Sequence, residues 1–343
     1  MSKIFLKKIY IGGTVLCLLL IGIASIAYYA FYGSATNAKS VIRIDQKSDY
    51  AAVCKMVEGV VNSKIQSAAF NFYASHINLE RRFKQGYYEI EPATSVIRIA
   101  RRLAIGDQTP VKLVINNCRT LPQLSQQIAE QIACDSMQII SAMHDAKLRA
   151  ELGYVKDSLI ATFIPNTYEI YWTITPEDLI RRMKRESDTF WNAERVAKLK
   201  RTRLTRYEAI TLASIIYEET KCQEEMPLIA GVYINRLRRR IPLQACPTVK
   251  YALGDFALTR ILHKHTRTRS PFNTYINQGL PPAPICIPSI AAIDAVLNYA
   301  AHNYLYFCAK PEFDGRHNFA RTLSEHNANS RQYLRALKSV NNK

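Results

Sequence analysis

The sequence contains no two cysteines separated by two residues, although eight cysteines occur among its 343 residues. Cys17 lies in a long apolar run, and the other seven are scattered along the chain: Cys54, Cys118, Cys134, Cys222, Cys246, Cys286 and Cys308. Structural zinc sites use clustered cysteine and histidine ligands, so this spacing argues against a site of that kind. Because seven is odd, a complete disulfide framework is excluded, whereas buried free thiols and one or two bridges both agree with the sequence.

Acidic residues are scarce: 28 Asp and Glu stand against 46 Lys and Arg, which gives a net charge of +18. The excess predicts an anionic partner, either nucleic acid, lipid headgroups or an anionic polymer outside the cell. The basic clusters "NRLRRR" and "HKHTRTR" lack interleaved aromatic residues on which bases could stack, so a nucleic-acid binder is supported by charge alone. In the second cluster, His263 and His265 lack a third metal ligand nearby, which favours a basic loop over a metal site.

Charged residues are absent between Lys8 and Lys39, and this gap contains the apolar run "IYIGGTVLCLLLIGIASIAYYAFYG". The run is long enough to cross a bilayer, which predicts a transmembrane helix over residues 9–32. Basic residues before the run predict a cytoplasmic tip over residues 1–8 and an extracytoplasmic location for the rest of the chain. A cleavable signal peptide is the alternative, but its apolar core is normally shorter, about 7 to 15 residues.

Strand-like and helix-like segments alternate over residues 40–155, which predicts an N-terminal α/β region. The pairs are "VIRID" before "DYAAVCKMVEGVVN", "FKQGYYEIEP" before "ATSVIRIARRLAIG", and "VKLVINN" before "TLPQLSQQIAEQIA". This recurrence is either a loose internal repeat or the ordinary rhythm of a mixed domain. The aromatic segment "FIPNTYEIYW", followed by a basic helical stretch, marks a second region over residues 156–343. The whole pattern predicts an α+β fold.

The segment "ASIIYEET" places two adjacent carboxylates, Glu218 and Glu219, at the end of a helical run. Thr205 and Glu208 form a capping-box pattern that predicts the start of this helix. Apolar residues then recur at helical spacing and predict one buried face, with Glu219 on its flank and Glu218 on the opposite side. Desolvation raises the pKa of a carboxyl, so Glu219 is the better candidate for an acid catalyst. The alternative is that both are solvated residues near a helix end.

Several longer motifs occur in a fixed order over about residues 160–330. They are "FIPNTYEIYW", "LASIIYEET", "IAGVYINRL", "LQACPTVKYALGD", "SPFNTYINQGLPPAPICIPS", "NYLYFCAK" and "HNFARTLSEHN". Their order resembles the endolytic murein transglycosylases, the MltG or YceG-like family. The resemblance implies an N-terminal transmembrane helix, a LysM-like part within the α/β region, and a mixed α+β YceG-like catalytic domain.

The resemblance implies a lyase that cleaves the β-1,4 bond from N-acetylmuramic acid to N-acetylglucosamine in nascent peptidoglycan strands. Glu219 matches the family's general acid and base, and the products would end in 1,6-anhydro-N-acetylmuramic acid. The family plan needs neither metal nor cofactor. It implies a single-pass inner-membrane protein with a periplasmic catalytic domain that terminates strand elongation. Its partners would be glycan strands, the membrane and cell-wall synthases, and nucleic acid would not be among them.

Other polar residues of these motifs are candidates for substrate binding. They are Asn235, Gln244, Asn273, Thr274, Tyr275, His317 and Asn318, with His326 and Asn327 as further candidates for the cleft wall. Amide and hydroxyl groups could bind sugar hydroxyls or N-acetyl groups. Each residue taken alone is more often a structural polar side chain with its hydrogen bonds satisfied.

The chain departs from the family pattern at three motif positions. Tyr217 stands two residues before Glu219 where relatives usually have another Glu, Cys246 replaces the Asp of Q-x-D-P-T-V, and Ala283 replaces the Gly of GLPPGP. Loss of two acidic groups would lower the pKa of Glu219 or remove a hydrogen-bond partner that orients it. The alternative function is therefore a catalytically impaired, membrane-anchored scaffold that binds peptidoglycan.

Overall fold

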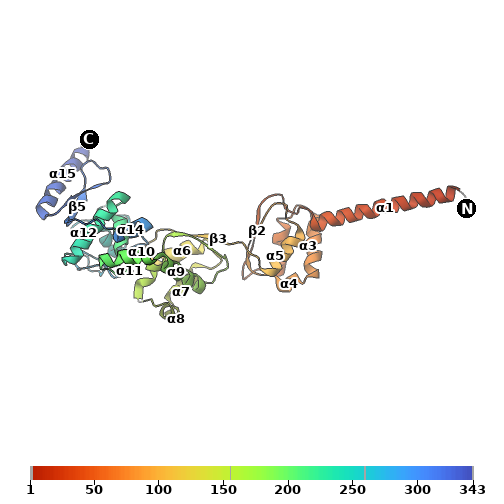
Figure 1. Cartoon of the computed structure of the whole chain (residues 1–343), viewed down its shortest axis with the longest axis horizontal. Coiled ribbons are helices and arrows are strands. Elements are labelled where there is room, and N and C mark those ends of the chain that lie inside the picture. Colours follow the sequence, from red (N-terminus) through yellow and green to blue (C-terminus); the bar gives the residue numbers. More distant parts are fainter. Residues whose placement is uncertain (1–2, 155, 259, 342–343) are drawn as a thin grey trace. The chain divides into compact units, whose positions relative to one another are not determined.

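The chain divides into two compact units in the computed structural model, which describes residues 3–154, 156–258 and 260–341 (Figure 1). Unit 1 consists of Met1–Lys112, Gln131–Ala133 and Glu169–Ile174, and unit 2 consists of Leu113–Glu130, Cys134–Tyr168 and Thr175–Lys343. Helices and short antiparallel sheets occur together, so the fold is mixed α and β. Residue 155, where the sequence predicts a domain boundary, lies outside the described residues.

Helix α1 (Lys3–Tyr32) belongs to unit 1 and contains the predicted apolar run. Its segment Tyr10–Tyr32 has a mean hydropathy of 2.2 and is long and apolar enough to cross a membrane. The last turns of α1 contact helices α3 (Lys64–His76) and α5 (Val96–Ile105), where Ala30 is buried. The apolar helix predicted from the sequence is thus present, and its end packs on the core of unit 1.

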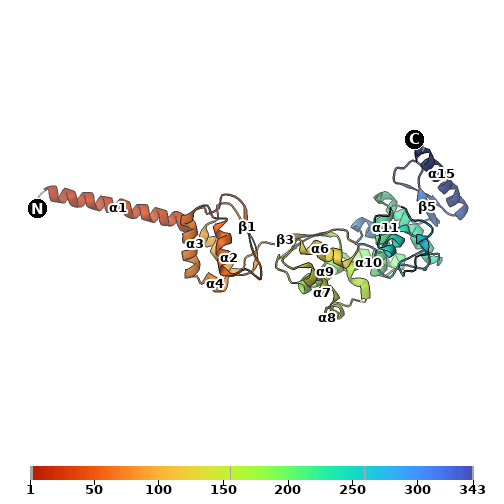
Figure 2. The ribbon, with the colours of Figure 1, turned by 180° about the vertical axis from the view of Figure 1, so that it is seen from behind.

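The rest of unit 1 is a two-stranded sheet with helices packed against it. Its further elements are β1 (Ser40–Ile44), α2 (Tyr50–Glu58), α4 (Leu79–Arg82) and β2 (Gly86–Ile90). Strands β1 and β2 are antiparallel, with Ser40 opposite Ile90 and Ile44 opposite Gly86. Figure 2 shows α2 beside α3, and both contribute fully buried side chains such as Val53 and Phe70 to the core. The predicted strands and the helices after them are confirmed in these places.

Unit 2 is mainly helical, and its described residues also form short stretches of 3-10 helix and two-stranded sheets. Its elements, including strands β3 and β4 whose residues fall partly in unit 1, are β3 (Val111–Ile115), α6 (Leu121–Ala129), α7 (Ser136–His144), α8 (Ala146–Glu151), η1 (Lys156–Thr162), β4 (Asn166–Ile170), α9 (Pro176–Phe190), α10 (Ala193–Thr202), α11 (Arg206–Glu219), η2 (Gln223–Glu225), α12 (Met226–Arg238), α13 (Cys246–Leu253), η3 (His265–Arg267), α14 (Ile290–Leu297), β5 (Tyr306–Ala309), β6 (His317–Ala320) and α15 (Leu323–Asn341). Strand β3 pairs with β4, and β5 pairs antiparallel with β6.

Helix α11 lies at the centre of unit 2 and differs from its prediction. Every residue from Ala209 to Ile216 is buried, so the helix is covered on all sides rather than on one face. Helices α12, α13 and α14 all contact it, which explains the burial of Thr211 and Ser214 on what the sequence predicts to be its solvent side. Both hydroxyls donate hydrogen bonds to backbone carbonyls within the helix, and these bonds permit the burial. The predicted capping box of Thr205 and Glu208 is confirmed.

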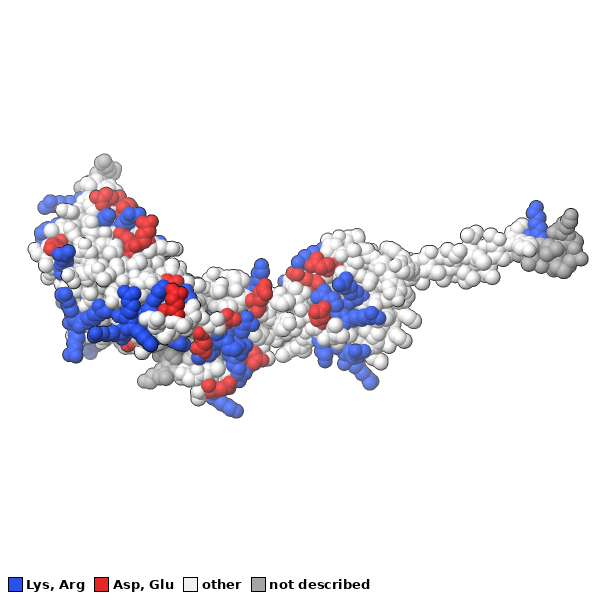
Figure 3. Space-filling view, viewed as in Figure 1, with Lys and Arg blue, Asp and Glu red and all other residues white. Residues whose placement is uncertain are grey.

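The basic stretch after "FIPNTYEIYW" forms two helices, α9 and α10, which are separated at Trp191 and Asn192. Asn192 accepts a hydrogen bond from the backbone of Arg195 and starts the second helix. Where α10 and α12 end, Arg238 donates to the carbonyl of Arg201 at 3.4 Å, so two basic helix ends meet. Figure 3 shows Lys and Arg gathered on this part of unit 2. The charge excess of the sequence therefore forms a surface, which favours anionic partners.

Gly231 allows α12 to pack closely against the segment that follows α14. A Cβ atom at this position would meet the carbonyl oxygen of Ala300 and would lie 2.6 Å from Nε2 of His302. We therefore expect Gly231→Ala to lower the free energy of unfolding by about 1–3 kcal/mol, because the packed backbone has to move. Urea unfolding followed by the fluorescence of buried Trp191 measures the effect.

Gly59→Ala is the matched control for this prediction. A Cβ on Gly59 would make only ordinary contacts, the nearest at 3.5 Å, and its φ of −69° suits any residue. This variant is expected to leave the Trp191 transition unchanged. An equally stable Gly231→Ala protein would show that α12 does not need this close approach.

Candidate active site

Glu219 is the last residue of α11, and its carboxyl faces α12. The helix stops there because Thr220 adopts extended backbone, with φ −143° and ψ 146°. Tyr233, on the facing helix, is buried and donates its hydroxyl hydrogen bond to Oε1 of Glu219 at 2.8 Å. The ring of Tyr233 packs edge-on against Phe307 of β5, with centroids 5.8 Å apart. Helix packing thus holds the carboxyl in one position.

Burial raises the pKa of Glu219 to about 7. Desolvation is the largest cause, and the negative charge of Glu218 raises the pKa further. The hydrogen bond from Tyr233 and the positive charge of Lys250 lower it in part. A carboxyl with this pKa exists in both protonation states near neutral pH, so it can donate a proton in one step and accept one in the next.

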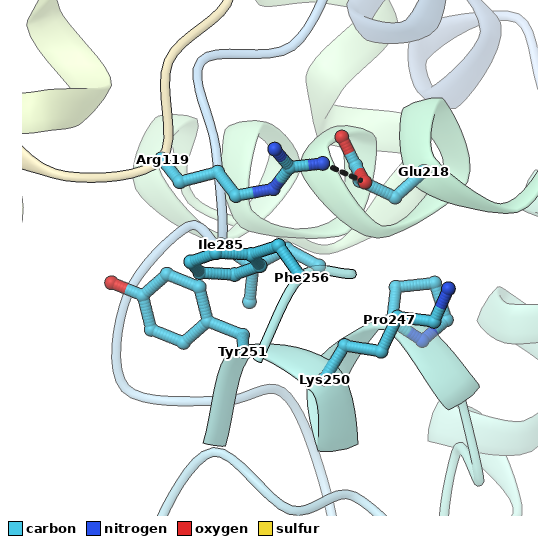
Figure 4. A pocket seen from close by; sticks show the side chains of 7 residues that line it. All are labelled: Arg119, Glu218, Pro247, Lys250, Tyr251, Phe256 and Ile285. Atoms are coloured by element: carbon cyan, nitrogen blue, oxygen red, sulfur yellow. Dashed lines mark hydrogen bonds and ion pairs between the residues drawn. The ribbon is translucent and has the colours of Figure 1, made fainter. Parts of the chain in front are cut away.

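Glu218 lies in a different environment from Glu219. Its Oε2 accepts a hydrogen bond from Nη2 of Arg119 at 2.7 Å, and the two form an ion pair (Figure 4). Arg119 comes from the loop before α6, and its guanidinium lies over the ring of Phe256, 4.7 Å from the ring centre. Glu218 is therefore held in an ion pair and acts on Glu219 through its charge, whereas the Glu219 carboxyl accepts its hydrogen bond from Tyr233.

Cys246 and Tyr275, two residues of the predicted motifs, lie close to Glu219. The thiol of Cys246 is 3.3 Å from the hydroxyl of Tyr275. Desolvation by the surrounding atoms raises the pKa of both groups, and the charge of Glu219 raises each pKa further. Both groups are therefore neutral at pH 7. They can donate hydrogen bonds beside Glu219 but do not supply a second carboxylate.

Three of the other predicted substrate-binding residues make hydrogen bonds to the backbone of unit 2. The side-chain amide of Asn235 donates to the carbonyls of His302 and Tyr304, at 2.7 and 3.1 Å. Asn273 is fully buried, and its amide donates to the carbonyls of Thr266 and Thr268. The hydroxyl of buried Thr274 accepts from the amide of Ala245 at 3.0 Å. These contacts favour a role in shaping the loops around the site.

Gln244 is exposed in the loop before α13. Its φ of 53° lies in the left-handed region, and its Oε1 accepts a hydrogen bond from Nη1 of buried Arg236 at 3.2 Å. Among the residues that the structure describes, no hydrogen bond is made by its side-chain amide nitrogen. A substrate-binding role for Gln244 stays a prediction.

His317 lies in β6, and its Nδ1 pairs with Oε2 of Glu225 at 2.9 Å. Its ring packs edge-on against Phe307, which also packs against Tyr233. The β5–β6 hairpin thus contacts Tyr233, the residue that donates a hydrogen bond to Glu219. Asn318 lies opposite Cys308 in the same hairpin. His326 stacks on Tyr306 at 5.4 Å, and Asn327 is exposed on α15. Of these residues, His317 has the shortest chain of contacts to Glu219.

The cysteine thiols and the His263–His265 pair were the other candidates for bridges or metal ligands. All eight cysteines are free thiols. Within residues 3–154, 156–258 and 260–341, no three His, Cys, Asp or Glu side chains form a group that could hold a metal ion. His265 accepts a hydrogen bond from the backbone of Leu262 at 3.1 Å in its loop.

Sequence reasoning missed Tyr233, Lys250 and Arg119 as neighbours of the two glutamates. Tyr233 is part of the quoted motif "IAGVYINRL", and Lys250 is part of "LQACPTVKYALGD". The occurrence of Tyr233 and Lys250 in these motifs was the feature of the sequence that could have pointed to them. Their contacts with the glutamates depend on how α11, α12 and α13 pack.

Replacement of Tyr233 by Phe removes the hydrogen bond that stabilises the Glu219 carboxylate. The pKa of Glu219 is then expected to rise further, and the basic limb of the pH–rate profile moves to higher pH. We expect kcat to fall about tenfold, because the carboxyl loses the partner that orients it. The variant leaves the other groups that interact electrostatically with this carboxyl unchanged. They are Lys250, Glu218, Cys246 and Tyr275.

Tyr168→Phe is the matched control for Tyr233→Phe. It also removes a buried tyrosine hydroxyl, whose hydrogen bond goes to the carbonyl of Ile164 at 2.6 Å. The control is expected to keep the wild-type pH profile. A profile for Tyr233→Phe that matches the wild type would show that this hydroxyl does not act on Glu219.

The sequence matches a known protein family and several named bacterial proteins. Residues 42–332 match the family described as YceG-like. A protein of Bacillus subtilis strain 168 named endolytic murein transglycosylase is 28% identical over 310 residues, which cover 85% of this chain and 84% of that protein. Proteins of the same name from Streptococcus pneumoniae strains D39 and R6 are 27% identical over 356 residues. The match to each covers 92% of this chain but 64% of the pneumococcal protein, less than two thirds of its length.

A solved structure supports the same relationship. The crystal structure of the yceG-like protein lmo1499 from Listeria monocytogenes aligns with a TM-score of 0.57 and 28% identity. The alignment covers 84% of this chain and 98% of that structure. Because the family match runs from within β1 to within α15 and so covers well over half of the sequence, this chain belongs to the YceG-like family.

Proposed function

We propose that this protein is an endolytic lytic transglycosylase that cleaves peptidoglycan glycan strands. The observation that carries the proposal is the carboxyl of Glu219, which helix packing holds beside Tyr233 with a pKa of about 7. The relatives named endolytic murein transglycosylase supply the substrate class. Glu219 is the proposed general acid and base.

The reaction needs one carboxyl with two protonation states. Protonated Glu219 donates its proton to the glycosidic oxygen, and the bond from that oxygen to C1 of N-acetylmuramic acid breaks. The resulting carboxylate takes the proton from the C6 hydroxyl of the same sugar, whose oxygen forms a bond to C1. The products are a 1,6-anhydro end and a free C4 hydroxyl on N-acetylglucosamine, and Glu219 ends protonated as it began. No water is consumed, so a second carboxylate to activate water is not needed.

The substitution of Cys246 for the family Asp agrees with this scheme. The loss of nearby acidic groups would by itself lower the pKa of Glu219, but desolvation outweighs that loss and the pKa is raised. Cys246 and Tyr275 supply neutral hydrogen-bonding groups at this position. Gln244, Tyr275 and His317 are the predicted residues whose surroundings best suit contact with sugar, whereas Asn235, Asn273, Thr274 and Asn318 would support the cleft wall.

Helix α1 is the proposed membrane anchor of the enzyme. Its apolar length suits a single crossing, with residues 1–8 in the cytoplasm and the catalytic region over 156–343 outside it, in the periplasm of a two-membrane envelope. The strand–helix–helix–strand order of β1, α2, α3 and β2, with short α4 before β2, supports the proposed LysM-like part of residues 40–155. Tethering would confine cleavage to new strands near the membrane, which suits termination of strand elongation beside the synthases.

The experiment that tests the proposal is digestion of isolated sacculi by the full chain in detergent, with mass spectrometry of the released fragments. Fragments that end in 1,6-anhydro-N-acetylmuramic acid support the proposal. Reducing ends would instead indicate hydrolysis. Protein that sediments with sacculi and releases nothing would favour the scaffold function motivated by Tyr217 and Cys246.

A further inference from the structure

A small cavity lies beside α11 (Figure 4). Its lining comes from the loop before α6, from α11, from α13 and the loop after it, and from the loop before α14. The lining residues are Arg119, Glu218, Pro247, Lys250, Tyr251, Phe256 and Ile285. All of them belong to unit 2, and Glu218 adjoins Glu219 in sequence. Nothing in the proposed proton transfers uses this cavity.

The cavity carries one positive charge that is not neutralised. Arg119 is paired with Glu218 at 2.7 Å, and its guanidinium lies on the Phe256 ring. Across the part of the chain that the structure describes, no carboxylate lies within ion-pair distance of Lys250. The charge of Lys250 nevertheless acts on Glu219, whose pKa it lowers, so the ammonium lies near the proposed catalytic group. Such a lining attracts an anion and disfavours a cation.

The size of the cavity limits what can enter it. Its volume is about 40 Å³ for water-sized groups. One water molecule needs about 10–15 Å³ of a volume measured in this way, so the cavity holds roughly three groups of the size of a water molecule. A carboxylate has three heavy atoms and fits this space, whereas a sugar ring does not. The aromatic rings of Tyr251 and Phe256 and the fixed Arg119–Glu218 pair form its walls (Figure 4).

We propose that this cavity is a carboxylate subsite in which Lys250 binds an acidic group of the substrate next to the bond that is cleaved. The inference rests on the proposed function, because in peptidoglycan the carboxylates nearest the glycan belong to the stem peptide or, where the peptide has been removed, to the lactyl group of muramic acid. The subsite would select strands that carry such an acid over neutral glycans. Arg119, held by Glu218, acts as a positioning residue that shapes the pocket without direct pairing to the acid.

Binding to the Glu219→Gln full chain in detergent tests this subsite separately from turnover. The probes are a disaccharide–peptide fragment of peptidoglycan with free carboxylates, the same fragment with its carboxyls amidated, and a disaccharide that keeps only the lactyl carboxylate. Titration calorimetry should give about tenfold weaker binding for the amidated fragment. Since residue 219 is an amide in this protein, the protonation of Glu219 cannot cause the difference.

Substitution of Lys250 identifies the side chain responsible. In the same Glu219→Gln background, Lys250→Met should remove the preference for the carboxylate, and Lys250→Arg should retain it. Lys264→Met, which removes an exposed lysine from another loop, should bind both fragments as the parent does. Equal affinity of the parent for the charged and amidated fragments would overturn the subsite, as would an unchanged preference in Lys250→Met.

The lactyl disaccharide shows which carboxylate is bound, and the kinetics test the subsite in the intact enzyme. If the lactyl disaccharide binds as tightly as the peptide fragment, the bound acid is the lactyl group; weaker binding assigns it to the stem peptide. With Glu219 intact, Lys250→Met should raise KM for peptide-bearing strands about tenfold. If the intact protein released no anhydro ends while the binding preference remained, the proposed reaction would fail and the carboxylate subsite would stand.

Discussion

Replacement of Glu219 by Gln is expected to lower the release of 1,6-anhydro ends by at least 10²- to 10⁴-fold. The amide can still accept the hydrogen bond from Tyr233, so the site keeps its shape. It cannot donate a proton to the glycosidic oxygen or remove one from the C6 hydroxyl, and general acid–base catalysis contributes about this factor. The measurement is the rate of anhydro-end formation from isolated glycan strands, followed by mass spectrometry.

The control for this prediction is Glu194→Gln, which changes an exposed glutamate of α10 that pairs with Lys198 on the same helix. It should keep the wild-type rate. In the wild type, the basic limb of the pH–rate profile is expected near pH 7, where Glu219 loses its proton. A Glu219→Gln variant with the wild-type rate, or a profile without this basic limb, would assign the acid function to another group.

The stability of unit 2 is expected to depend on pH through the same carboxyl. The pKa of Glu219 is about 7 in the folded protein against an ordinary value of 4.5. Between these values the folded state holds a proton that the unfolded state has lost, so stability falls as pH rises from about 4.5 to 7 and is constant above. The difference corresponds to about 3 kcal/mol. Burial of this carboxyl therefore destabilises the fold at neutral pH in favour of function.

Unfolding of the wild type and of Glu219→Gln at pH 4.5 and pH 8 measures this contribution. Other titrating groups are common to both proteins, so the difference between them isolates residue 219. Relative to the wild type, the Gln variant should gain about 3 kcal/mol between pH 4.5 and pH 8. Trp191, which is buried in the same hydrophobic cluster as α11, reports the transition of unit 2. Parallel pH dependences in the two proteins would show that the pKa of Glu219 is not raised by folding.

Local patterns in the sequence were sufficient to predict several individual helices and strands. The apolar run predicts α1, alternation predicts β1, and the capping pair of Thr205 and Glu208 predicts where α11 starts. Gly106, with φ 78°, ends α5 in the left-handed conformation that favours glycine. These features depend on residues that are neighbours in the chain, so a single sequence contains the information.

The environment of α11 could not be predicted in the same way. Ala209, Leu212, Ala213 and Ile216 suggest one apolar face, yet the opposite face is also buried, because three helices surround it. Small and hydroxyl-bearing residues such as Ser214 are compatible with either solvent or a close neighbour. The choice between the two depends on segments such as α14, which are distant in sequence.

By itself, the sequence determined the apolar N-terminal helix, the α+β character and the family, and it led to the prediction that Glu219 rather than Glu218 is the acid. Only the tertiary structure decided what acts on that carboxyl: the hydroxyl of Tyr233, the charge of Lys250, and the neutral pair of Cys246 and Tyr275. The reason is physical. The sequence gives the type of each side chain. Its pKa depends on desolvation and on charges from several packed segments, and these segments meet only when the chain folds.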